Sequence, residues 1–150
     1  MAPFAARLIA RLSNTLQNAR VQRLRDDEKR AVLTLLQAVA LSDGVLAAAE
    51  DEEIKKTAHT LGVSLSKDFA LPEAIAVLAH RPAALKLACL LVADAFFVDG
   101  DYDAQEKAFV ASFAARFKLS ANPLAEAVEQ LRNKKLDDAL ADWHEEIARA

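Results

Sequence analysis

Several residue types that specialised sites require are scarce in this sequence. A single cysteine, Cys89, excludes a disulfide framework, and only three glycines leave no glycine-rich loop for a phosphate or a dinucleotide. The three histidines, His59, His80 and His144, share no ligand spacing, which argues against zinc. No nucleophile with an adjacent base is recognisable. These absences favour a protein that is not an enzyme.

Long apolar runs are also missing. The run 87–92 is far shorter than the roughly 20 residues that span a bilayer, and Asp94 interrupts its continuation. Arg7 and Arg11 break up any apolar core of a secretory signal at the start of the sequence. We therefore expect a cytoplasmic protein.

The composition favours a compact helical chain. Apolar residues make up 53% of the sequence, with three glycines and four prolines, so little of it is suited to turns and loops. A chain of 150 residues fits one domain, which buries about 70% of its unfolded surface. Apolar spacing and stop signals predict an all-α bundle of about seven helices. The expected helices are 26 to about 40, 48–61, 72–80, 82–98, one after the second acidic motif that carries Phe109, Phe113 and Phe117, 122–133, and one from 137. Gly62, Pro72 and Pro82 mark helix boundaries.

The first 25 residues differ from the rest in charge. They hold five arginines and no acid, whereas the remainder has 14 basic and 22 acidic residues. Apolar positions from Phe4 to Leu16 form one stripe, so we expect a basic amphipathic helix over residues 1–25 ahead of a helical domain over 26–150. This stripe packs on the protein's own body, or the helix contacts a partner or an anionic membrane surface. The arginines available for such a contact are Arg7, Arg11, Arg20 and Arg23. Nucleic acid is not expected, because the acidic body repels phosphates.

One pattern occurs twice, in 41–50 and in 97–106. Both stretches read D-G-x-apolar-x-x-x-E between an apolar helix and the next helix, 56 positions apart. The agreement extends into the flanks, where Val63 aligns with Leu119. The sequence therefore predicts a duplicated helix-turn-helix hairpin, with repeats at about 32–64 and 88–120 and pseudo-twofold symmetry.

The repeated acids suggest a cation. Asp43 and Glu50 in the first copy, and Asp99 and Glu106 in the second, match the second half of an EF-hand loop, whereas the first half is apolar. One hairpin supplies too few oxygens for calcium, so either the hairpins pool their carboxylates or each adds carbonyls and water. A metal-free alternative is also open, because Asp103 and Glu106 have the spacing of a capping box. That alternative explains neither Asp99 nor Asp101, nor the recurrence of Glu50.

A duplicated motif of this kind in an all-α chain of this length resembles the TerB-like domain of tellurite-resistance proteins. The resemblance covers about residues 27–120. It implies a pseudo-symmetric helical bundle that binds metal, calcium above all, through acids gathered on one face. The implied ligands are Asp43, Glu50, Asp99 and Glu106, with Asp101 and Asp103 beside them; the first copy has Ala47 to Ala49 instead of such extra acids.

The sequence leaves three functions open. The leading one is a non-enzymatic module that binds a divalent cation, which the resemblance places in tellurite or stress resistance near the inner membrane surface. An adaptor domain without metal is the second, with protein partners that the sequence does not identify. A two-metal phosphoester hydrolase is the third, and it lacks a visible base or phosphate clamp.

Overall fold

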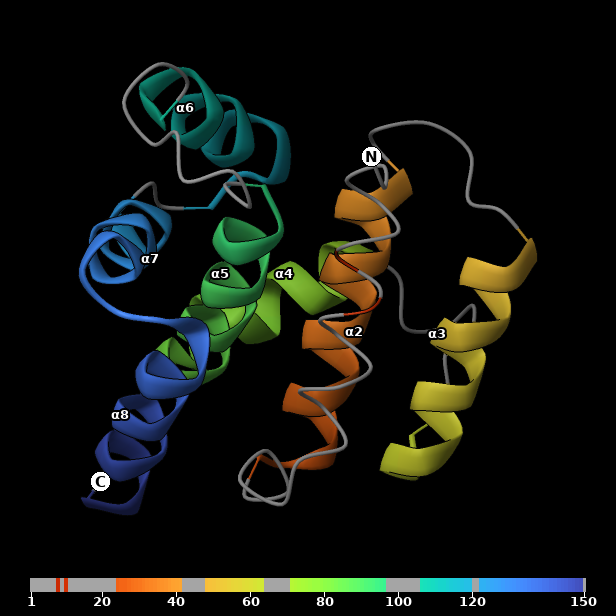
Figure 1. The fold of residues 1–150 in the computed structure, drawn as a ribbon. Coiled ribbons are helices and arrows are strands. Elements are labelled where there is room, and N and C mark those ends of the chain that lie inside the picture. The colour runs from red at the N-terminus through yellow and green to blue at the C-terminus, as the bar shows by residue number, and fades with distance from the viewer. Residues whose placement is uncertain are drawn as a thin grey trace.

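The computed structural model describes residues 8, 10, 24–41, 48–63, 71–96, 106–119 and 122–149. In these residues every regular element is an α-helix, which confirms the all-α fold class (Figure 1). The helices are α2 (Asp26–Leu41), α3 (Ala48–Leu61), α4 (Leu71–Ala79), α5 (Pro82–Phe96), α6 (Glu106–Phe117), α7 (Asn122–Asn133) and α8 (Leu136–Arg149). The predicted boundaries agree with these to within two residues, including Pro72 and Pro82 in the first turns of α4 and α5.

The start of α2 is stabilised by its own acids. Its first turn carries Asp26, Asp27 and Glu28, as the dipole of the helix favours. The residue before the helix is Arg25, and the carboxylate of Glu28 reaches back to accept a hydrogen bond from its backbone N–H at 3.0 Å. This is the second half of a capping box, made without a capping side chain at its first position.

Helix α5 is the centre of the bundle, as its nearly uniform apolar sequence predicts. It packs against α2, α4, α7 and α8, and the whole stretch 87–93 is buried. Helix α2 in turn packs against α3 and α4, and α7 contacts α6 and α8. The core is therefore continuous from α2 through α5 to α8.

The helices of the two predicted repeats have closely matching boundaries. Moved by 56 positions, α2 begins where α5 begins and α3 ends where α6 ends. Each repeat is followed by a helix that packs on its first member, α4 on α2 and α7 on α5. The hairpins differ in one respect: α3 runs back alongside α2, whereas α6 lies beyond the end of α5, next to α7 (Figure 1). The pseudo-twofold symmetry itself stays a prediction.

Part of the N-terminal stripe is accounted for by the core. Leu8 is helical and fully buried, and it belongs to the same cluster of apolar side chains as α2 and α5. At this residue the stripe packs on the protein's own body. The arginines Arg7, Arg11, Arg20 and Arg23 lie outside the described residues.

No single helix among the described residues is both long and apolar enough to cross a membrane. Helix α4 and residues 82–94 of α5 reach the required length and composition only as a pair, bent by 116°. Both helices contribute side chains to the buried core.

Candidate functional site

Two of the six predicted metal ligands fall within described helices. Glu50 is the third residue of α3, and Glu106 is the first residue of α6. The positions of their side chains are outside what the structure describes, and so are the residues Asp43, Asp99, Asp101 and Asp103 as a whole. That these six carboxylates gather on one face therefore stays a prediction.

The helices that lead into the two motifs are placed side by side. α2 and α5 are in contact, and in Figure 1 both run toward the upper end of the view, where each ends. Asp43 follows the last residue of α2 by two positions, and Asp99 follows the last residue of α5 by three. The two helices that precede the motifs thus end on the same side of the molecule.

The electrostatic character of this end follows from the helices themselves. The C-terminus of a helix carries about half a negative charge, and neither α2 nor α5 has a basic residue in its last turn to offset it. The last turn of α5 instead contains an acid, Asp94, whose side chain is half-buried. Two helix C-termini whose last turns hold no basic residue thus precede the acids of the motifs.

The beginning of α3 has an explanation that needs no metal. Glu50 is followed by three more acids, of which Glu52 is exposed and Glu53 is half-buried. Acids in the first turn stabilise a helix through its dipole, as they do in α2. The contact between Glu28 and Arg25 shows that this fold also uses a glutamate as a cap. The capping interpretation of Glu50 and Glu106 therefore remains open.

The described part of the chain contains no group of three or more His, Cys, Asp or Glu side chains that could hold a metal ion. His59 near the end of α3 and His80 after α4 are exposed, and His144 on α8 is half-buried. The three lie on separate elements, in keeping with their irregular spacing in the sequence.

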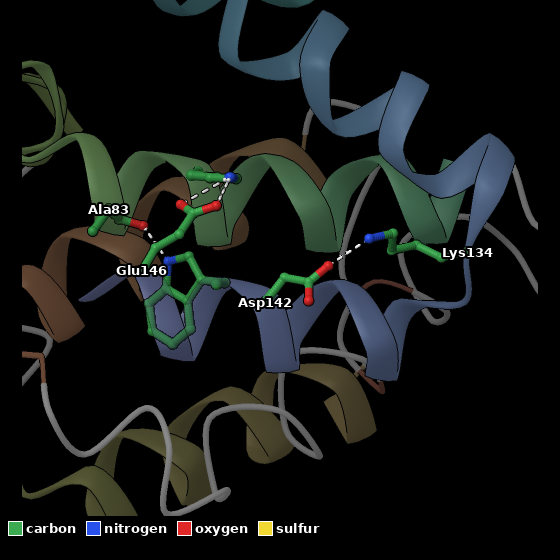
Figure 2. Close-up of polar contacts among 6 residues, drawn as sticks. Ala83, Lys134, Asp142 and Glu146 are labelled. Atoms are coloured by element: carbon green, nitrogen blue, oxygen red, sulfur yellow. Dashed lines mark hydrogen bonds and ion pairs between the residues drawn. The ribbon is translucent and has the colours of Figure 1, made fainter. Parts of the chain in front are cut away.

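Sequence reasoning missed the contacts that hold α8 on α5 (Figure 2). The buried indole of Trp143 donates a hydrogen bond from Nε1 to the carbonyl oxygen of Ala83 at 2.8 Å. Lys86 Nζ donates to both carboxylate oxygens of Glu146, at 2.9 and 3.0 Å. The only signal in the sequence was Lys86 itself, a single cation within an apolar stretch. These contacts fix the first half of α5, whose other end leads into the second motif.

Among the described residues, two groups have a clearly shifted pKa. Cys89 is buried in α5, and burial raises the pKa of its thiol to about 12. The hydrogen bond from Lys134 to Asp142, which joins the turn before α8 to that helix, raises the pKa of Lys134. Neither group lies in the two motifs, so both shifts concern the scaffold and not the candidate site.

Comparison with known families bears on the first half of the chain. Residues 10–71 match the family model described as tellurite resistance protein TerB. The match confirms the predicted resemblance to TerB, but over residues 10–71 and not over the expected 27–120. The TerB match includes Asp43 and Glu50 and ends before Asp99 and Glu106. Comparisons with curated proteins and with solved structures gave no significant match.

Proposed function

We propose that this chain is a non-enzymatic TerB-like module that binds a divalent cation, calcium in the first place, between its two D-G motifs. The observation that carries the proposal is the arrangement of α2 and α5, which are in contact and run toward the same end of the molecule. A single hairpin offers too few oxygen ligands for calcium. A site shared by both hairpins has four carboxylates, from Asp43, Glu50, Asp99 and Glu106.

Electrostatics supports a cation at this position. The last turns of α2 and α5 hold no basic residue, so both helix dipoles favour a positive charge at this end, and the acids of the motifs add to that preference. Like charges brought together raise each other's pKa and destabilise the folded state. A bound cation removes this repulsion, so binding and folding become coupled.

The test is a thermal melt of the chelated protein, titrated with calcium, magnesium and manganese. A site held at a hundredfold its dissociation constant adds about 2.7 kcal/mol, which for a chain of this size raises the Tm by roughly 5 to 10 °C. Asp99→Asn and Glu106→Gln should abolish this rise while melting no lower than the wild type in chelator. Asp43→Asn and Glu50→Gln should do the same if the motifs share one site.

A matched control separates binding from helix capping. Glu52→Gln removes one exposed acid near the beginning of α3 without altering either motif, so it should leave the calcium response intact. If no cation moves the melt and the motif variants are only less stable, the acids are caps and the chain is a metal-free adaptor. Manganese-dependent hydrolysis of a generic phosphodiester, lost in Asp99→Asn, would instead support the two-metal hydrolase.

We further propose that the module acts in tellurite or stress resistance, in the cytoplasm and peripheral to the inner membrane. The support is the TerB match for the role, and the arginine-rich segment 1–25 for the membrane contact. Because Leu8 is buried, such contact would be electrostatic and not an insertion of the apolar stripe.

Sedimentation with anionic vesicles tests the membrane contact. Binding should fall with salt and be lost when Arg7, Arg11, Arg20 and Arg23 are all changed to Gln. Growth on tellurite of cells that carry the wild type or Asp99→Asn tests the role in tellurite resistance. Equal growth would show that this role does not depend on the second motif.

A further inference from the structure

We draw no further inference here: the strongest candidate, the acidic outer face of α8 that includes Asp137, Asp138, Asp142 and Glu146, carries nothing because Lys134 and Lys86 already pair with Asp142 and Glu146 and nothing in the structure shows what covers this face.

Discussion

Gly62 and Lys118, 56 positions apart, end α3 and α6 in the same left-handed conformation, with φ of 72° and 53°. In both places the next residue donates its N–H to a carbonyl five positions back, Val63 to Ala58 at 3.1 Å and Leu119 to Ala114 at 3.2 Å. This is the hydrogen bond of a Schellman cap. Helices α3 and α6 thus end in the same type of cap, with glycine at the left-handed position of α3 and lysine at that of α6.

Lys118→Gly should stabilise the protein. A left-handed residue with a side chain costs about 1–2 kcal/mol, and glycine loses about 0.5–1 kcal/mol more backbone entropy on folding, so the net gain is about 0.5–1 kcal/mol. Gly62→Ala should destabilise the protein by about 1 kcal/mol, because alanine is strained at a positive φ. No steric clash adds to this cost, since a Cβ at this position meets no atom within 4 Å. Urea unfolding followed by circular dichroism measures both changes.

An exposed alanine in α6 supplies the control for this pair. Ala115→Gly introduces glycine at a right-handed position of the same helix, and it should destabilise by about 1 kcal/mol. If Lys118→Gly behaves like Ala115→Gly, the left-handed cap of α6 is not present in solution.

The contact between α5 and α8 predicts a ranking of variants. Trp143→Phe removes the donor to Ala83 and some buried volume, so it should cost about 1–2 kcal/mol, and Trp143→Ala about 3–5 kcal/mol. Glu146→Gln breaks an ion pair whose side chains are 27% and 56% exposed, so it should cost less than about 1 kcal/mol. Chemical unfolding gives the three values. A Trp143→Phe variant no less stable than Glu146→Gln would mean that α8 is held mainly by charge.

Local sequence signals explain why most of the fold was predictable. Gly62 and Pro82 mark helix boundaries through their own backbone preferences, and the apolar run of α5 indicates its central place. Lys118 has no such preference, and only its alignment with Gly62 could have revealed the left-handed cap. The bond from Trp143 to Ala83 joins residues 60 positions apart, which no local pattern encodes.

The candidate site was predictable to a lesser degree. The pattern of acids identified Glu50 and Glu106 as residues at the beginnings of helices, which the described helices agree with. Whether carboxylates of the two motifs meet depends on how the repeats pack, and that packing comes from apolar contacts between α2 and α5. The acids themselves carry no information about those contacts.

The raised pKa of Lys134 predicts that the stability of the fold depends on pH in the alkaline range. Its pKa is raised in the folded state, above all by the hydrogen bond to Asp142, so the protonated form is favoured by folding. The resulting stabilisation is present below the unfolded lysine pKa of about 10.4 and is lost as the pH rises through the folded value. Asp142→Asn should lower the pKa of Lys134, as followed by the 13Cε shift of that lysine in an NMR titration.

Another acid of α8 tests whether that shift is local. Asp137 is exposed in the first turn of the same helix and does not contribute to the raised pKa. Asp137→Asn should therefore leave the titration of Lys134 nearly unchanged. If both variants lowered the pKa of Lys134 equally, the overall charge of α8 and not the hydrogen bond to Asp142 would be the cause of its raised pKa.

The thiol of Cys89 reports on opening of the core. It is buried in the middle of α5, and with a pKa of about 12 it has almost no thiolate at neutral pH. A disulfide reagent should therefore label Cys89 only when α5 leaves the core, and the rate should rise with urea as the population of open molecules does. Fast labelling of the folded protein, independent of urea, would contradict the tight packing of α5.

The same labelling connects the core to the proposed cation. Because α5 ends at the second motif, a cation bound there must dissociate before α5 can unfold. Calcium at a hundredfold its dissociation constant should then slow the labelling of Cys89 about 100-fold, the same factor by which it stabilises the folded state. Glu106→Gln should label at one rate with and without calcium, whereas Glu52→Gln should retain the slowing. If calcium raises the Tm but leaves the labelling rate of the wild type unchanged, the cation binds elsewhere, away from the end of α5.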